Sequence, residues 1–344
     1  MEHNALSYSN FIIVREEYLK AFNEEWERFL DSFNVNVSEA QQLHIGNQVR
    51  PQLVLWGALL NKEDCTEVDY RAIAKVAVSI EAVHKASVLI DDIIDGDAKR
   101  RGVACVHHVY GEYPTLLFAI CLLIKGIAQI DNYSHRYSGD TSLKIIKILC
   151  ETIQAMCLGA IDEISASTQQ QMDLKRILRI IDFETAQLIK NSLYMGFILT
   201  AEPDDNIGQI LCTIGTKCGY IFQVMNDLEP FCNPKYIEDY KGKVNFDFVR
   251  SRKNIVIPYL YRSCSKSDKE IVLACLDNQG AFDEILRLFH KYKIKTQITT
   301  ELEYTYKSIG TSLADIENQH KKWAIAFGAF INDLRQKYSS ILYS

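Results

Sequence analysis

The chain has 344 residues and a net charge of −6, from 44 acidic and 38 basic side chains. That balance gives no support for a nucleic-acid-binding protein, which should present a basic face. Hydrophobic residues make up 48% of the chain, as in globular proteins, and 16 glycines with 6 prolines are too few for the turns of an all-β fold.

Long stretches without helix breakers predict an all-α protein. Between residues 71 and 94 there is no Gly or Pro, and apolar side chains recur every three or four residues. Residues 8–33 are typical of an amphipathic helix, and 230–247 of a loop. Three further helical stretches contain a single glycine each: 142–164, 172–201 and 311–344. Without an internal repeat or a Gly/Ser linker, we expect one helical domain over residues 1–344.

Targeting and redox signals indicate a cytoplasmic protein. The N-terminus, MEHNALSYSNF, lacks the basic and apolar regions of a signal peptide. The most apolar window, 116–124, is shorter than the roughly 20 residues of a membrane span, so no stable span is expected. The ten cysteines include no Cys-x-x-Cys pair, and most lie in apolar stretches. We expect buried free thiols in a reducing compartment.

Three acids end the predicted helix 71–94. Asp91 and Asp95 are one turn apart and share a face, with Asp92 beside them. Carboxylates this close repel one another unless a cation binds, and carboxylates with waters and substrate phosphates suit Mg²⁺. A solvated acidic helix end is the alternative, although acids at a helix C-terminus oppose the helix dipole.

Basic residues follow these acids. Lys99, Arg100 and Arg101 lie four to six residues after Asp95. Metal ions on one side and guanidinium groups on the other would clamp a diphosphate. The same charges would stabilise a diphosphate as its bond to carbon breaks.

The stretch DDIIDGDAKRRGVACVHHVYG, residues 91–111, resembles the first aspartate-rich motif of the trans-isoprenyl diphosphate synthases, or polyprenyl synthetases. The resemblance covers about residues 40–260 and includes IGNQVRPQLVL (45–55), FETAQL (183–188), GTKCGYIFQVMNDLEP (215–230) and YKGKVNFDF (240–248). It implies an isoprenoid-synthase-type helical bundle around a deep apolar cavity. The two aspartate-rich helix ends would face each other across its mouth.

The resemblance also implies roles for individual residues. Three acids would hold Mg²⁺ on an allylic prenyl diphosphate, and Arg100 would bind that diphosphate; Asn226 and Asp227 would be further metal ligands. The acids are Asp91, Asp92 and Asp95, which with Arg100 form the implied catalytic set.

Further matching positions imply substrate contacts. Arg50, His84 and Arg101 would bind the diphosphate of isopentenyl diphosphate, the usual second substrate. The remaining implied substrate-binding residues are Thr185, Phe222, Gln223 and Lys243. Family members usually dimerise, so a homodimer is expected.

The sequence departs from the family pattern at both diphosphate sites. Asn47 and Glu184 stand where the family has lysine, and the second aspartate motif begins with Asn226 and ends with Pro230. Lost cations would weaken diphosphate binding. We therefore predict a Mg²⁺-dependent prenyltransferase that transfers a prenyl group to isopentenyl diphosphate or to a non-standard prenyl acceptor.

Two alternatives share this fold. The pair Asn226-Asp227 also resembles the second metal motif of class I terpene cyclases, but that motif wants Ser or Thr and then Glu where this chain has Pro230 and Pro234. A non-catalytic subunit of a heteromeric prenyl synthase is the other alternative. The intact first motif argues against it.

Overall fold

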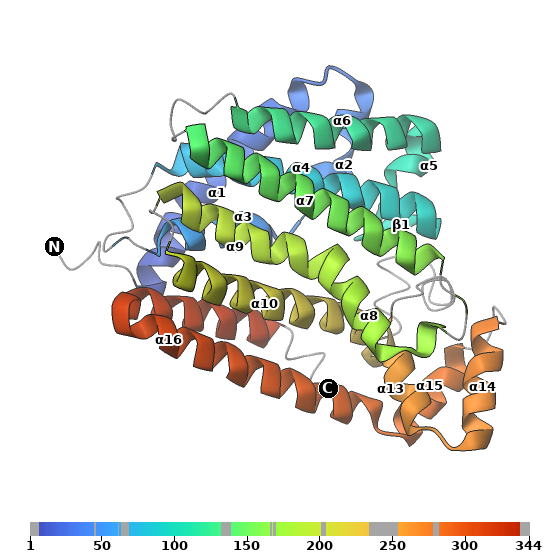
Figure 1. Cartoon of the computed structure of the whole chain (residues 1–344). Helices are drawn as coiled ribbons and strands as arrows, with labels where there is room; N and C mark the ends of the chain where they lie inside the picture. Colours follow the sequence, from blue (N-terminus) through green and yellow to red (C-terminus); the bar gives the residue numbers. More distant parts are fainter. Residues whose placement is uncertain are drawn as a thin grey trace.

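The computed structural model describes residues 7–44, 46–60, 62, 69–131, 139–165, 167, 170–200, 204–233, 254–277 and 282–337. Helices dominate these residues, so the predicted all-α fold is confirmed (Figure 1). The helices of the first half are α1 (Tyr8–Asp31), η2 (Asn36–Glu39), α2 (Gln41–His44), α3 (Val49–Ala58), α4 (Tyr70–Asp95), α5 (Val106–Tyr110), α6 (Glu112–Asp131) and α7 (Gly139–Ile164). Those of the second half are η4 (Gln170–Met172), α8 (Leu174–Ile181), η5 (Asp182–Ala186), α9 (Gln187–Thr200), α10 (Asp205–Cys232), α13 (Val256–Ser263), α14 (Lys266–Asp277), α15 (Phe282–Lys291) and α16 (Ile294–Lys337). Two short strands, β1 (Lys99–Arg100) and β2 (Val103–Ala104), pair antiparallel.

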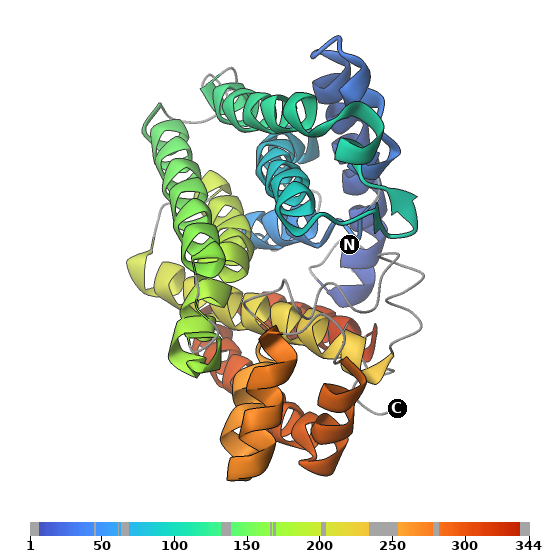
Figure 2. The ribbon, with the colours of Figure 1, turned by 90° about the vertical axis from the view of Figure 1, so that its right-hand side faces the viewer.

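Helix α4 packs against α1, α3, α6 and α9, which surround it in the upper part of the view in Figure 2. Its first turn is capped by Asp69, whose carboxylate accepts the main-chain N–H groups of Arg71 and Ala72 at 3.1 Å each. It ends at Gly96, which adopts the left-handed conformation that terminates helices, with φ of 63°. The helix predicted over 71–94 is thus present, and the three acids lie in its last two turns.

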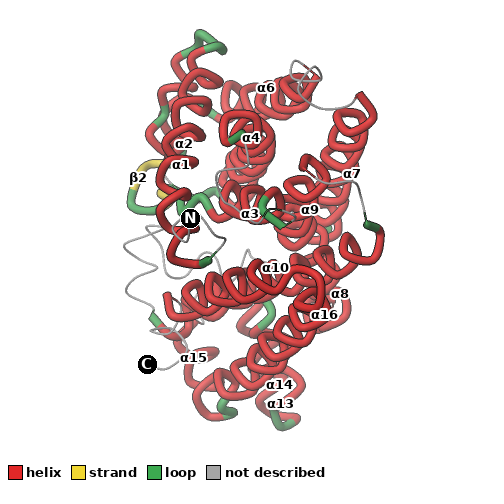
Figure 3. The backbone as a smooth tube through the Cα atoms, turned by 90° about the vertical axis from the view of Figure 1, so that its left-hand side faces the viewer, coloured by secondary structure: helices red, strands yellow, loops and turns green. Residues whose placement is uncertain are grey.

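An aromatic cluster joins the two ends of the chain. Phe11 of α1 stacks on Trp56 of α3 with ring centroids 3.9 Å apart. Trp323 of α16 donates its indole N–H to the main-chain oxygen of Trp56 at 2.8 Å. All three side chains are buried, so burial of large rings stabilises the closure of the bundle. Figure 3, which shows the left-hand side of the view in Figure 1, labels the three helices α1, α3 and α16.

Helices α3 and α9 touch backbone to backbone. A Cβ added at Gly57 would lie 2.0 Å from the main-chain oxygen of Leu193, and one at Gly196 would lie 2.0 Å from that of Val54. Only glycine fits at either position, because any side chain would overlap the facing helix. The two glycines therefore set how close α9 approaches the helix that begins beside Arg50.

Some sequence-based boundaries were wrong. The single helix expected over 172–201 is divided into α8, the π-helical turn η5 and α9. Pro230 was placed in a loop but lies inside α10, which continues to Cys232. The last helix begins at Ile294 and bends at His320, where φ is −132° and ψ is 50°. The π turn could not be foreseen, because it inserts one residue into an otherwise regular helical pattern.

Helix α6 is more apolar than its sequence window suggested. The nine-residue window stopped at Lys125, whereas Glu112–Ile130 has a mean hydropathy of 1.7 and is long enough to cross a membrane by length and composition alone. In the structure α6 packs on α4, α5 and α7. Nine cysteines are described and all are free, but three of them, Cys121, Cys150 and Cys157 on α6 and α7, are exposed, which corrects the expectation of buried thiols.

Candidate functional site

The acids of the first motif divide into two kinds at the end of α4. Asp91 and Asp95 are half-buried and lie one helical turn apart. The Asp92 side chain between them is 1% exposed. A burial difference of this size predicts different partners for the two kinds of acid, because a buried carboxylate must be paired.

Asp92 is paired with Arg100. The Nε and Nη2 atoms of Arg100 each lie 2.6 Å from Asp92 Oδ1, and Nη2 lies 3.7 Å from Asp97 Oδ2. Burial alone would lower the pKa of Arg100, but Asp92 and Asp97 outweigh it and raise that pKa. The β1–β2 hairpin brings Arg100 back to the acids that precede it in the chain. Two predicted catalytic residues are therefore in direct contact.

Four basic side chains from α3, α4 and the turn after β1 lie close to one another. These residues, Arg50, His84, Lys85 and Arg101, are called the cationic cluster below. A Cβ added at Gly46 would lie 3.3 Å from Arg101 Nη1 and 3.8 Å from Lys85 Nζ, so both cations line the turn before α3. Burial lowers the pKa of His84 well below 6.5, and Arg50, Lys85 and Arg101 lower it further. A neutral imidazole among guanidinium and ammonium groups suits an anion such as a diphosphate.

Lys85 is a member of this cluster that the sequence analysis missed. Its side chain is buried, and its Nζ lies 3.8 Å from Glu81 Oε1. Burial lowers the pKa of Lys85, while Glu81 opposes that shift. The available signal was a lysine placed next to His84 and one turn after Glu81 in a helix rich in apolar residues. A buried lysine needs a negatively charged partner, here Glu81, to stay charged.

A second set of predicted residues forms a hydrogen-bonded chain across three elements. Thr185 Oγ1 on η5 donates to Gln223 Oε1 at 2.9 Å, and Gln223 Nε2 donates to Asp227 Oδ1 at 2.8 Å on α10. Asp227 Oδ2 accepts the main-chain N–H of Ile255 at 2.8 Å. Both carboxylate oxygens of Asp227 thus hold protein donors, which positions the start of α13 against α10. Its role as a metal ligand stays a prediction.

The rest of the second motif is more open. Asn226 is exposed and Glu229 is half-buried, and burial raises the pKa of Glu229. Lys243 lies outside the described residues. Arg50 lies over the ring of Phe222, with its guanidinium carbon 6.0 Å from the ring centroid, so the cationic cluster reaches α10.

The substituted lysine positions differ in their surroundings. Asn47 is exposed in the turn before α3, and its main-chain oxygen accepts from Gln52 Nε2 at 3.3 Å. Glu184 is half-buried on the π turn, and a Cβ added at Gly159 of α7 would lie 2.8 Å from Glu184 Cγ. The Glu184 side chain therefore packs against α7.

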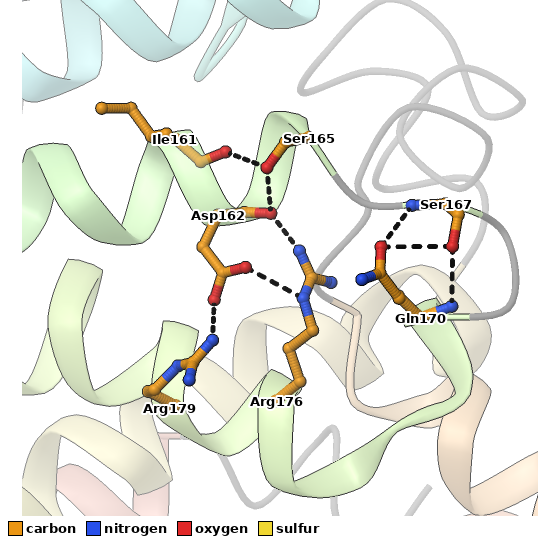
Figure 4. Close-up of polar contacts among 7 residues, drawn as sticks. All are labelled: Ile161, Asp162, Ser165, Ser167, Gln170, Arg176 and Arg179. Carbon is orange, nitrogen blue, oxygen red and sulfur yellow. Dashed lines mark hydrogen bonds and ion pairs between the residues drawn. The ribbon is translucent and has the colours of Figure 1, made fainter.

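A group of ion pairs, called the clamp below, joins the end of α7 to α8, the helix that leads into the π turn (Figure 4). Asp162 near the end of α7 pairs with Arg176 Nε at 3.0 Å and also contacts Arg179, both on α8. Burial alone would raise the pKa of Asp162, but hydrogen bonds and charges from Arg179 and Arg176 lower it. The clamp fixes α8 against α7 immediately before residues 182–186.

A cavity of about 400 Å³ lies between α8, η5, α10 and α16. Its lining is mainly apolar and includes Leu178, Thr216, Tyr220 and Tyr304. None of the predicted site residues lines it. It is therefore separate from the charged side chains at the ends of α4 and α10.

Comparisons with known proteins identify the family of the chain. The family model described as polyprenyl synthetase matches residues 35–291. A short chain isoprenyl diphosphate synthase of Methanocaldococcus jannaschii is 25% identical over 281 residues, covering 80% of this chain and 81% of the relative. Component 2 of the heptaprenyl diphosphate synthase of Bacillus subtilis is 29% identical over 229 residues, covering 63% of this chain and 57% of the relative.

A solved structure shares the fold. The polyprenyl synthase of Caulobacter crescentus, complexed with calcium and isoprenyl diphosphate, superposes with a TM-score of 0.75 at 18% identity and covers 94% of this chain and 98% of that one. The fold and the matches define an all-α enzyme of the prenyltransferase class. The chain belongs to the polyprenyl synthetase family, as the sequence resemblance predicted.

Proposed function

We propose that the chain is a Mg²⁺-dependent prenyltransferase. It would take the prenyl group of an allylic prenyl diphosphate and join it to isopentenyl diphosphate or to a non-standard acceptor. The observation that carries this proposal is the cationic cluster beside the acidic end of α4, with Arg101 Nη1 and Lys85 Nζ both near Gly46. The acidic end of α4 suits a diphosphate that is bound through a metal ion, and the adjacent cationic cluster suits a second diphosphate.

The first motif fits a magnesium ion that is shared with substrate. Asp91 and Asp95 offer hard oxygen ligands from one helix face. Within the described ranges, no group of three or more His, Cys, Asp and Glu side chains is gathered closely enough to hold a metal alone. Mg²⁺ commonly binds through one or two carboxylates and completes its coordination with waters and phosphate oxygens. When bound, it would neutralise charge on the leaving diphosphate.

The protein's own residues would then divide the remaining work. Arg100, held by Asp92, would contact the allylic diphosphate and stabilise its charge as it leaves. Arg50, His84 and Arg101 would bind the diphosphate of the acceptor. An apolar cavity inside the bundle would keep water from the allylic cation.

The neutral residue at position 47 favours a drifted acceptor site. Asn47 carries no charge in the turn beside the cationic cluster, so one ionic contact to isopentenyl diphosphate would be missing. Glu184 turns towards α7 and adds a negative charge on the π turn. An enzyme with a different nucleophile would tolerate the change at position 47, because only the allylic diphosphate would then need its clamp. A different nucleophile would not remove the effect of Glu184, whose position corresponds to a family lysine that touches the allylic diphosphate.

The test is turnover by the purified chain. We would incubate it with farnesyl or geranylgeranyl diphosphate, Mg²⁺ and labelled isopentenyl diphosphate, and analyse the products. An elongated diphosphate supports chain elongation, and a hydrocarbon formed without an acceptor would favour the terpene cyclase. The control Asp91→Ala should abolish turnover. Activity in that variant with unchanged Mg²⁺ dependence would contradict the metal assignment.

We further propose that the whole chain acts as one domain in the cytoplasm and as a homodimer. Exposed apolar side chains, unusual for a monomer, crowd two neighbouring helices. They are Tyr113, Leu116, Leu117, Ile120 and Ile124 on α6, and Leu143, Leu158, Ile161 and Ile164 on α7. Light scattering after size exclusion should give twice the chain mass, and Leu117→Glu should give monomers. A wild-type monomer that turns over only after a second protein is added would instead indicate a component of a heteromeric synthase, as the name of the Bacillus subtilis relative suggests.

A further inference from the structure

Gln42 lies at the meeting point of the two charged regions. It belongs to the four-residue helix α2, and its side chain is buried. Its Nε2 donates to Asp92 Oδ2, and its Oε1 accepts the main-chain N–H of Val106 at 3.0 Å. Its main-chain oxygen accepts from Lys85 Nζ at 3.2 Å. One residue therefore contacts the acidic motif, the start of α5 and the cationic cluster.

The two partners of the side chain fix the orientation of its amide. Asp92 can only accept and the N–H of Val106 can only donate, so the NH₂ group must face Asp92 and the oxygen must face Val106. Rotating the amide would place oxygen against a carboxylate and nitrogen against an N–H group. The hydrogen bond to Asp92 is therefore specified by the surroundings of Gln42.

The carboxylate of Asp92 is held from both sides. Its Oδ2 accepts from Gln42, and its Oδ1 accepts Arg100 Nε at 2.6 Å. Without the amide, the carboxylate could rotate about its Cβ–Cγ bond and change the direction in which it presents Arg100. The Arg100 side chain keeps 23% of its surface exposed, so its outer edge is within reach of a ligand.

We propose that Gln42 is a positioning residue that orients Asp92 and Arg100 relative to Lys85, and so sets the spacing between the two diphosphate sites. This inference rests on the proposed function, because it assumes that Arg100 and the cationic cluster bind diphosphates. Gln42 itself touches no reacting atom. It acts by holding an acid and a cation that would otherwise move independently.

The experiment compares wild type, Gln42→Leu and the control Gln129→Leu. Gln129 also donates its amide to α4, through the main-chain oxygen of Lys75 at 3.1 Å, but far along the helix from the acids. We would measure binding of inorganic diphosphate with Mg²⁺ by calorimetry, and kcat and KM for the allylic diphosphate per folded molecule. Gln42→Leu should bind diphosphate about tenfold more weakly, as expected for losing a buried hydrogen bond to a charged group, and Gln129→Leu should match wild type.

The outcomes separate this inference from the proposed function. A merely structural role would lower the melting temperature of Gln42→Leu but leave diphosphate affinity, kcat and KM per folded molecule unchanged, and that result would overturn the inference. If Gln42→Leu does not fold, Gln42→Met decides, because methionine keeps about the same volume in an unbranched side chain and adds no charge, while it loses the donor for Asp92. Wild type that binds diphosphate without prenyl turnover would count against the proposed function alone. Wild type without diphosphate affinity would overturn both.

Discussion

Replacing Asp92 with asparagine tests whether the acidic motif contains a structural ion pair. Asparagine keeps the shape of the side chain but has one acceptor oxygen, whereas Arg100 and Gln42 each need an acceptor. Removing one partner of a buried ion pair costs about 3–5 kcal/mol. Because Asp97 remains 3.7 Å from Arg100 Nη2, we expect the lower end, about 3 kcal/mol.

That free energy converts into a measurable shift. Unfolding entropy of about 2.1 cal/mol/K per residue gives about 0.7 kcal/mol/K for 344 residues, so Asp92→Asn should lower Tm by about 4 °C. Calorimetry and urea denaturation would measure it. The control Glu151→Gln removes the exposed pair with Lys147 and should cost about 0.5 kcal/mol or less. A loss of under about 1 kcal/mol in Asp92→Asn would refute the structural ion pair.

Three further substitutions test other parts of the structure. The folded protein has a lowered pKa at His84, so the unfolded chain binds more protons near and below pH 6.5, and the stability of the protein should fall as the pH drops below that value. Denaturation curves measured from pH 5 to 7.5 should show a weaker pH dependence of stability for His84→Gln than for wild type. Equal slopes in the two proteins would contradict this assignment. Gly57→Ala should destabilise the protein by about 3 kcal/mol or more, because the new Cβ would lie 2.0 Å from the main-chain oxygen of Leu193. The control Gly310→Ala faces open space in a helix and should stabilise the protein by about 0.5–1 kcal/mol. If calorimetry gave stability changes of the same sign for both variants, the close contact at Gly57 would be wrong. Asn47→Lys should lower the KM for isopentenyl diphosphate if that is the acceptor, and an unchanged KM in steady-state assays would favour another acceptor.

The sequence predicted what depends on local pattern. Apolar periodicity located α4 and placed Asp91 and Asp95 on one face near its C-terminal end, because both follow from helix geometry alone. The family motif likewise placed Arg100 near the acids. The amphipathic pattern of residues 8–33 predicted α1, and the near absence of helix breakers in 142–164 predicted α7, each to within a few residues.

What the sequence could not predict depends on contacts between distant segments. Asp92 and Asp95 look alike in the sequence, and only the packing of Gln42 and Arg100 shows that Asp92 is held from both sides. Lys85 and Arg101 come close to each other beside Gly46, and the path of the turn that contains Gly46 cannot be predicted from local sequence patterns. Asp227 holds the N–H of Ile255, 28 residues further along the chain.

The π turn at 182–186 gives the bundle an unusual sensitivity to chain length. It contains one residue more than an α-helix needs, and each residue of an α-helix advances the direction of its side chains by about 100°. Deleting one residue there would let the hydrogen-bond ladder close up and would rotate α9 by that angle relative to α8. Gly196 would then turn away from Val54, and a bulkier neighbour would face α3 in its place. Deleting Phe183, for example, would keep every charged residue of the site and still disturb the packing of α9 on α3, the helix that carries Arg50.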